Sequence, residues 1–220
     1  MERQAFMQAV TRIYPWIKQM EREAFALHEQ VNQRYDGILP YGFHLKLTAS
    51  YVSKYGHEVA SDPADIGVLY ASAYLHDSIE DARMTYHDVE KLMRRMAADP
   101  LLSEAEQLRL TTEVPEIVYA LTNEKGRNRD ERANERYYAG IRSVRFASFV
   151  KMCDRLANIR YTTLFYLTNR MLAVYRNEYP AFIQAITEGS VTPVPSDMRQ
   201  EMETLLHDDH YMISDQTLND

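Results

Sequence analysis

The sequence predicts an all-α protein that folds as a single helical domain. Only 7 Gly occur among the 220 residues, Met and Ala are frequent, and runs of alternating β-branched residues are few. This composition favours helices over sheets. A hydrophobic content of 45 % is enough for one substantial core. We therefore expect a bundle of helices around a common core.

Proline and glycine positions divide the first half of the chain. Residues 2–34 have the pattern of one or two helices, and Pro15 marks a start or a kink. A turn is expected at Tyr35-Asp36-Gly37, and Asp62-Pro63 suits the beginning of a helix. The predicted helical spans in this half are 2–34, about 44–55, and 62 to the pair His76-Asp77.

Side-chain caps mark the helices that follow. Thr85 can cap one helix, and Ser103 with Glu106 forms the capping box of the next. The segment 123–136 is polar and dense in charge, and Gly126 interrupts it. The predicted spans are 85–96, 103–121, 144–157, a helix that ends near 177, 181–187 and 196–207.

The chain has the organisation of one domain with a short C-terminal addition. Residues 1–195 form the expected domain, and no internal repeat, low-complexity segment or linker divides them. Pro193 and Pro195 set off residues 196–220, which we expect to form a short helix capped by Ser196 and a loose polar tail.

Bulk properties exclude several classes of function. The net charge of −7 argues against duplex nucleic acid as the main partner, because such binding depends on many Lys and Arg contacts to phosphates. The single cysteine, Cys153, allows no internal disulfide, and no stretch approaches the roughly 20 apolar residues of a membrane span. The first 20 residues lack the apolar core of a signal peptide. We expect a cytoplasmic protein that does not bind membranes, whose oligomeric state the sequence leaves open.

The pair His76-Asp77, followed by Glu80-Asp81, is the feature that packing explains least. The preceding segment, 67–75, is apolar or small apart from one Ser, so the polar cluster is expected at the end of a buried helix. On a continuous helix His76 shares a face with Glu80, and Asp77 shares one with Asp81. Unpaired buried charge is costly, and a divalent cation is the simplest partner. The alternative for a bare His-Asp pair is a capped helix end with a satisfied histidine.

Two other segments are expected to supply the missing ligands. Asp154 and Asn158 lie one helical turn apart among apolar neighbours, and His44 lies near the start of a predicted helix. The potential ligand set is His44, His76, Asp77 and Asp154. Imidazole and carboxylate ligands together suit manganese, iron or zinc better than calcium. We expect a divalent metal cofactor, with Mn²⁺ as the first choice.

Three strings of residues resemble the signature of the HD-domain metal-dependent phosphohydrolases, which is a distant His, an adjacent His-Asp and a later Asp. The strings are Tyr41-Gly42-Phe43-His44, His76-Asp77-Ser78-Ile79-Glu80-Asp81, and Lys151 to Asn158. Within that superfamily the chain is most similar to the RelA/SpoT-type guanosine polyphosphate hydrolases and their small single-domain relatives. Residues 32–37 and 121–125 extend the similarity. The two intervals between the strings are longer than in the small relatives, which bears on the substrate more than on metal binding.

The resemblance implies an HD-domain helical bundle that hydrolyses a small nucleotide, with release of pyrophosphate from the 3′ position of (p)ppGpp as the leading reaction. A bound cation lowers the pKa of a water molecule toward neutrality. Glu80 and Asp81 are expected to orient that water and move its proton, a contribution of roughly 10²- to 10⁴-fold in rate. Asn158 is expected to hold the water or a phosphate oxygen.

Basic residues near these motifs are candidates for phosphate binding. Arg34 shortly precedes the first proposed ligand, and the segment 123–136 contributes Lys125, Arg127 and Arg129. A solvated helix with ion pairs explains that segment equally well. Lys151 and Arg155 flank Asp154 and could balance its charge. The aromatic residues Tyr35, Tyr41 and Phe43 are expected to pack at the rim of the site.

Two alternatives remain open. An HD-type deoxynucleotide nucleotidase or triphosphohydrolase would keep the metal site and act on another substrate. A non-catalytic nucleotide-binding or protein-binding module would retain the site only as a relic. All ligand positions are filled, which argues against the relic.

Overall fold

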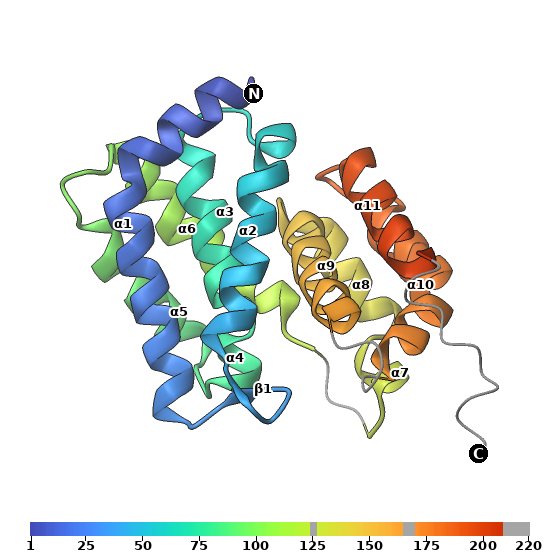
Figure 1. Ribbon diagram of the computed structural model, residues 1–220. Helices are drawn as coiled ribbons and strands as arrows, with labels where there is room; N and C mark the ends of the chain where they lie inside the picture. Colours follow the sequence, from blue (N-terminus) through green and yellow to red (C-terminus); the bar gives the residue numbers. More distant parts are fainter. Residues whose placement is uncertain (124–126, 165–169, 209–220) are drawn as a thin grey trace, which may run out of the picture.

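The computed structural model describes residues 1–123, 127–164 and 170–208, without the side chains at 129 and 130. Over these residues the chain is almost entirely helical, and its strands are limited to a hairpin of β1 (Arg34–Tyr35) and β2 (Leu39–Pro40) (Figure 1). The helices are α1 Arg3–Gln30, α2 Gly42–Val59, α3 Ala64–Leu75, α4 Ser78–Asp81, α5 Tyr86–Ala97, α6 Glu104–Leu121, α7 Arg129–Arg132, α8 Glu135–Ser143, α9 Ala147–Leu164, α10 Met171–Thr187 and α11 Ser196–His207. The all-α prediction is confirmed.

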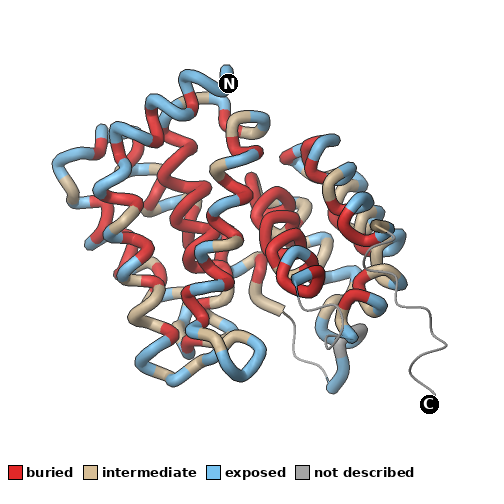
Figure 2. Tube along the Cα trace, viewed as in Figure 1, coloured by how far each residue is buried: buried red, intermediate tan, exposed pale blue. Residues whose placement is uncertain are grey.

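The bundle is built around two buried helices, α3 and α9. Every residue of α3 is buried, because α1, α2 and α6 pack around it. Helix α9 contacts α2, α3 and α6 on one side and α8, α10 and α11 on the other, so it joins the two parts of the bundle. Figure 2 shows buried residues along nearly the whole length of both helices. The prediction that the segment before His76 is buried is therefore confirmed.

Side-chain caps fix the beginnings of several helices where the sequence predicted them. Thr85 and Asp88 form a capping box at α5, and Ser103 and Glu106 form one at α6. The first helix, for which the sequence left one or two segments open, is continuous through Pro15. Helix α11 has the predicted bounds, but Ser196 lies inside it after the N-cap residue Pro195 and makes no capping hydrogen bond. The buried residues of α11 belong to the common core. The tail predicted to be loose lies, at 209–220, outside the described residues.

The sequence prediction was incomplete between residues 132 and 187. Helix α8 was not predicted, because only Tyr137 and Ile141 of its nine residues are buried and the segment before it is charged. The expected separate helix at 181–187 is part of α10, which continues through Pro180. Helix α9 begins at Ala147 rather than at 144, because Phe146 has a positive φ of 65° that a helix does not accommodate.

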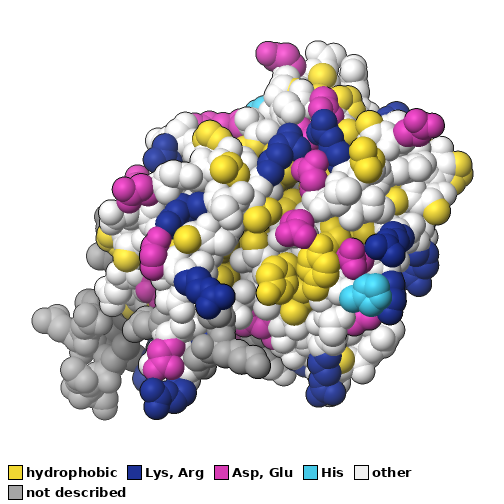
Figure 3. Space-filling view, turned by 180° about the vertical axis from the view of Figure 1, so that it is seen from behind, with side chains coloured by type: hydrophobic (Ala, Val, Ile, Leu, Met, Phe, Trp, Pro, Cys, Tyr) yellow, Lys and Arg dark blue, Asp and Glu magenta, His cyan; other side chains and the backbone are white. Residues whose placement is uncertain are grey.

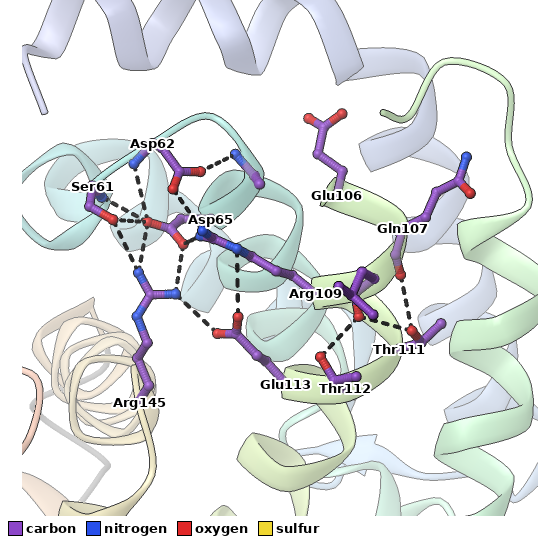
Figure 4. Close-up of polar contacts among 12 residues, drawn as sticks. Ser61, Asp62, Asp65, Glu106, Gln107, Arg109, Thr111, Thr112, Glu113 and Arg145 are labelled. Atoms are coloured by element: carbon purple, nitrogen blue, oxygen red, sulfur yellow. Dashed lines mark hydrogen bonds and ion pairs between the residues drawn. The ribbon is translucent and has the colours of Figure 1, made fainter. Parts of the chain in front are cut away.

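A buried ion network holds the end of the bundle where α3 begins. Asp65, on the first turn of α3, is fully buried. It accepts two hydrogen bonds, at 2.7 and 2.9 Å, from Arg145, which lies just before α9 (Figure 4). Arg109 of α6 also binds Asp65, and the backbone N–H of Ser61 donates to the same carboxylate at 2.7 Å. This network joins three segments that are distant in sequence and contributes to the placement of α9 against α3.

The surface carries both signs of charge. On the face shown in Figure 3, the described Lys and Arg side chains are interspersed with Asp and Glu side chains and do not gather into a basic patch. Within the described ranges, no helix combines the length and the apolar character needed to cross a membrane.

Candidate metal centre and adjoining pocket

Three separate helical regions bring two imidazoles and two carboxylates together. His44 lies on the first turn of α2, His76 and Asp77 form the link between α3 and α4, and Asp154 lies in the middle of α9. Helices α2, α3 and α9 all contact one another (Figure 1), so these residues meet inside the bundle. His44, His76 and Asp154 are buried. The structure therefore assembles all four residues of the predicted ligand set.

The distances among His44, His76 and Asp77 match a coordination site, and Asp154 lies close to both imidazoles. The Nε2 atoms of His44 and His76 lie 3.2 Å apart. Asp77 Oδ2 lies 2.8 Å from Nε2 of His76 and 3.4 Å from that of His44. Asp154 Oδ1 lies 3.3 and 3.7 Å from the Nε2 atoms of His44 and His76. Metal–ligand bonds of about 2.0–2.2 Å place neighbouring ligand atoms about 2.8–3.6 Å apart in octahedral or tetrahedral geometry. The group of His44, His76 and Asp77 could therefore hold a divalent cation, and Asp154 lies beside it.

The two carboxylates of the cluster, Asp77 and Asp154, require a positive charge between them. Burial raises the pKa of Asp77, but the charge of His76 and hydrogen bonds from both imidazoles outweigh it and hold the pKa well below its usual range. The pKa of Asp154 is also lowered, because Lys151 and the imidazoles outweigh burial. Burial lowers the pKa of His76, but Asp77 and Asp154 raise it to about 10. Imidazole protons or a divalent cation can supply the required charge.

The two imidazoles are oriented by different contacts. Nδ1 of His76 lies 2.9 Å from the carbonyl oxygen of Ala73, so it can donate to that oxygen and leave Nε2 as a ligand. The ring of His44 stacks on Tyr35, with ring centres 4.9 Å apart. Nδ1 of His44 is buried without a hydrogen-bond partner among the described residues. Both rings thus present Nε2 to the same point, as metal ligation requires.

Tyr41 links the cluster to Asp81, a role that the sequence analysis missed. The Tyr41 side chain was expected at the rim, but it is buried, and its hydroxyl lies 2.6 Å from Asp77 Oδ2 and 2.8 Å from Asp81 Oδ2. One hydroxyl proton can serve only one carboxylate at a time. Burial and the charge of Asp77 raise the pKa of Asp81, which eases proton sharing between the two carboxylates through Tyr41. The only sequence feature that pointed to Tyr41 was its place in the string that ends at His44.

A helix break corrects the predicted arrangement of the acidic residues. The helix was expected to end at His76-Asp77, close to its observed end at Leu75, but the predicted shared faces assumed a continuous helix to Asp81, whereas α4 begins separately at Ser78. Asp77 and Asp81 remain neighbours through Tyr41. Glu80, expected on the face of His76, is exposed instead, and both of its carboxylate oxygens accept hydrogen bonds from Nδ2 of Asn123 at 2.9 Å.

Asn158 contacts a ligand residue of the cluster. Its Nδ2 donates to Asp154 Oδ1 at 2.6 Å, and its Oδ1 accepts from the Tyr35 hydroxyl at 2.8 Å. These bonds hold the Asp154 carboxylate in place. Nδ2 also donates to the carbonyl oxygen of Asp154 at 3.1 Å, so a bond from Asn158 to a phosphate oxygen, as predicted, would replace one of these bonds, whereas Oδ1 can still accept from a water.

A pocket of about 450 Å³ adjoins the cluster. His44, Asp77 and Asp154 line one side of it, together with Glu80, Asp81 and Asn158. Helices α8 and α10 form the opposite wall with Tyr137, Tyr138, Tyr175, Glu178 and Phe182. The volume is in the range of small-molecule sites, roughly 300–1,000 Å³. The α10 residues were not predicted, because their position depends on contacts between distant helices.

The basic residues of the pocket differ from those proposed from the sequence. Arg34 is exposed on β1, and Arg127 is exposed and pairs with Glu131, and neither lines the pocket. Lys125 and the side chain of Arg129 lie outside the described residues. Instead, the described lining cations are Arg132, Lys151 and Arg155. Lys151 pairs with Asp154 at 2.9 Å, as its proposed role in charge balance requires.

Comparisons with family models, curated proteins and solved structures found no match to this chain. A functional assignment therefore depends on the geometry of the cluster, the chemistry of the pocket and the three sequence strings.

Proposed function

We propose that this chain is a metal-dependent phosphohydrolase that acts on a small nucleotide. The observation that carries the proposal is the convergence of His44, His76, Asp77 and Asp154 beside a pocket large enough for such a substrate. Two neutral imidazoles and two carboxylates are a donor set for borderline divalent ions, and their charge equals that of one M²⁺ ion. Mn²⁺ is the cofactor we propose to test first.

A cation held by these residues would supply Lewis acidity, which lowers the pKa of water toward neutrality and stabilises charge on a phosphoryl oxygen. The residues of the chain divide the remaining work. Asp81 is suited to hold and move a proton, because Tyr41 joins it to Asp77. Glu80 faces the pocket and is oriented by Asn123, so it is a second candidate for accepting a proton. Lys151 places a buried positive charge beside the reacting groups.

The resemblance to the HD-domain phosphohydrolases suggests the reaction to test first, release of pyrophosphate from the 3′ position of (p)ppGpp. A deoxynucleotide nucleotidase or triphosphohydrolase would use the same centre. The products separate these reactions, because they release pyrophosphate, phosphate and triphosphate respectively. A non-catalytic module would bind a nucleotide and release none of the three.

The test combines a substrate panel with two matched variants. The panel contains (p)ppGpp, NADPH, nucleoside monophosphates and deoxynucleoside triphosphates, each assayed with Mn²⁺ and with chelator. Asp77→Ala should lose both metal binding and turnover, whereas Glu80→Gln should keep the metal and lose most of the rate. Arg94→Gln, on the exposed side of α5, is the control that should change neither. Metal binding without turnover of any nucleotide would contradict the proposed hydrolase.

A further inference from the structure

The last turns of α1 lie beside the segment that carries Tyr41. The chain leaves α1 at Gln30, forms the β1–β2 hairpin and returns to Tyr41, and α1 also contacts α4 (Figure 1). Phe25 and His28, three residues apart, share one face of α1. Both side chains pack against the string of residues that begins at Tyr41. Helix α1 holds no candidate ligand, but this packing connects it to the candidate metal centre.

The imidazole of His28 stacks on the phenol ring of Tyr41. The ring centres lie 4.3 Å apart, and the ring planes are within 11° of parallel. His28 is 1 % exposed, and neither of its ring nitrogens has a hydrogen-bond partner within the described ranges. An apolar side chain would fill this volume without burying two unpaired polar atoms, so the filling of space alone does not explain a histidine here. Burial lowers the pKa of His28 to about 4, so the ring is neutral near pH 7 and adds no charge beside the centre.

Two other rings contact Tyr41 in a different geometry. Tyr35 meets it with ring centres 6.1 Å apart at an angle of 87°, and His44 meets it at 5.6 Å and 72°. Neither ring lies parallel to the phenol. Within the described part of the chain, His28 is thus the ring that is stacked on Tyr41, and it comes from a helix on which the sequence strings place no site residue.

Phe25 packs against the backbone next to Tyr41. A Cβ atom at position 42 would lie 2.8–2.9 Å from three carbon atoms of the Phe25 ring, closer than non-bonded carbon atoms approach. Gly42 therefore accommodates the ring because it has no side chain. Tyr41 is the N-cap residue of α2 and makes no side-chain capping hydrogen bond. The position of Tyr41 at the start of α2 therefore depends on packing from α1 rather than on a cap.

Helix α1 is itself fixed to the helix that ends at His76. Glu21 is 8 % exposed and lies about two turns before His28 on α1. Its Oε2 accepts a hydrogen bond at 2.9 Å from the hydroxyl of Tyr74, two residues before His76. This buried bond sets the register of α1 against α3. The two rings at the end of α1 are thus held by the same framework as one of the candidate ligands.

Building on the proposed hydrolase, we infer that two residues of α1, Phe25 and His28, form a clamp that positions Tyr41. The clamp holds the Tyr41 hydroxyl where it bridges Asp77 and Asp81, at 2.6 and 2.8 Å. The hydroxyl proton alone does not fix the ring, because it can serve either carboxylate. The stack restricts the orientation of the ring, and the packing of Phe25 restricts the backbone. Both are positioning residues that act through Tyr41.

Kinetics of two variants at position 28 test the stack, with Mn²⁺ and the nucleotide that the wild type turns over fastest. His28→Leu has no flat ring, and it should lower kcat at least about fivefold without changing KM or the number of bound Mn²⁺ ions. His28→Phe keeps a flat ring, and it should retain kcat within about threefold. His57→Leu is the matched control, because His57 also has a buried, unpartnered Nδ1 but lies at the opposite end of α2 from His44. It should leave kcat unchanged, and equal losses in His28→Leu and His28→Phe would overturn the stacking role.

A double-mutant cycle separates positioning from a general loosening of the core. In a Tyr41→Phe protein the bridging hydroxyl is absent, so His28→Leu should lower kcat no further. Gly42→Ala should displace Phe25 and show the same non-additivity with Tyr41→Phe, which provides a second route if His28→Leu does not fold. A fall in kcat by the same factor in both backgrounds would show that the defect does not act through Tyr41 and would overturn the inference.

Crystal structures of the variants give a readout that does not depend on turnover. In His28→Leu and in Gly42→Ala, the Tyr41 hydroxyl should lie beyond hydrogen-bond distance of Asp77 or Asp81, whereas His28→Phe should keep both contacts. Unchanged contacts in His28→Leu and Gly42→Ala would overturn the clamp and leave the hydrolase standing. If the wild type turns over no nucleotide, the hydrolase fails, and these structures still decide whether the clamp places Tyr41.

Discussion

Asp65→Asn tests whether the buried ion network at the start of α3 stabilises the bundle. The side chain of Asp65 is 0 % exposed, and it accepts hydrogen bonds from Arg109, Arg145 and Ser61. Asparagine keeps the shape but turns an amide N–H₂ toward an arginine and removes the charge that both arginines face. Breaking a buried pair costs about 3–5 kcal/mol. Because Arg109 and Arg145 are 30 % and 39 % exposed and can hydrate, we expect the lower end, about 3 kcal/mol.

Urea denaturation followed by circular dichroism measures this loss, which corresponds to a fall in Tm of about 6–12 °C for a domain of this size. Asp62→Asn is the matched control, because Asp62 binds the same Arg109 but is 41 % exposed, and it should cost less than about 1 kcal/mol. The reasoning is refuted if the two variants lose equal stability, or if Asp65→Asn loses less than about 1 kcal/mol.

The same variant has a defined pH dependence. Burial raises the pKa of Asp65, but Arg145 and Ser61 outweigh it, so the folded-state pKa lies below the unfolded value of about 3.9. A carboxyl group with a lowered folded pKa stabilises the fold above the unfolded pKa and loses that contribution as pH falls through the folded pKa. The difference in stability between wild type and Asp65→Asn should therefore be constant near neutral pH and shrink below about pH 4. A difference that grows on acidification would contradict the assignment.

Three further predictions concern the candidate metal centre. Tyr41→Phe keeps the ring and removes the hydroxyl that joins Asp77 to Asp81. We expect kcat to fall at least about tenfold and the number of bound Mn²⁺ ions to stay the same. An unchanged kcat would exclude this link from the reaction. The affinity for Mn²⁺ should rise with pH across the neutral range, by up to about tenfold per unit for each proton released. The sign follows because the pKa of His76 is raised to about 10, so a bound cation must displace its proton. Calorimetry in two buffers with different ionisation enthalpies counts the protons released when Mn²⁺ binds. A count of zero would contradict this prediction. Asn123→Ala should lower kcat more than it changes KM, because Glu80 loses the amide that orients it. Steady-state kinetics measures both constants. A change in KM alone would argue that Asn123 binds the substrate.

The sequence predicted the parts of the fold that depend on local interactions. Capping at Thr85 and Ser103 depends on residues within one helical turn, so these helix starts were correct. Helix α8 has two buried residues in nine, too few for a clear period. The pocket wall was not predictable for a different reason. Phe182 reaches the site only because α10 packs against α8 and α9, and sequence periodicity does not specify such contacts.

The candidate ligands were easier to identify than the residues around them. Ligand residues have a restricted chemistry, and their spacing within the three strings is visible in the sequence. Tyr41 and Asn123 form hydrogen bonds to Asp81 and Glu80, and tyrosine and asparagine occur in many other settings. Their roles appear only when segments 40 residues or more apart in the chain are placed together.

The break between α3 and α4 explains how the cluster keeps a balanced charge. On an uninterrupted helix, Glu80 would share a face with His76 and bring a third carboxylate to the buried centre. Asp77 instead has φ −99° and ψ 3°, which ends the helical hydrogen-bond pattern and leaves Glu80 exposed beside Asn123. Two carboxylates then face the two imidazoles, and one divalent cation would neutralise them. A third buried carboxylate would add charge without a partner, so the turn at His76-Asp77 allows the centre to be both buried and acidic.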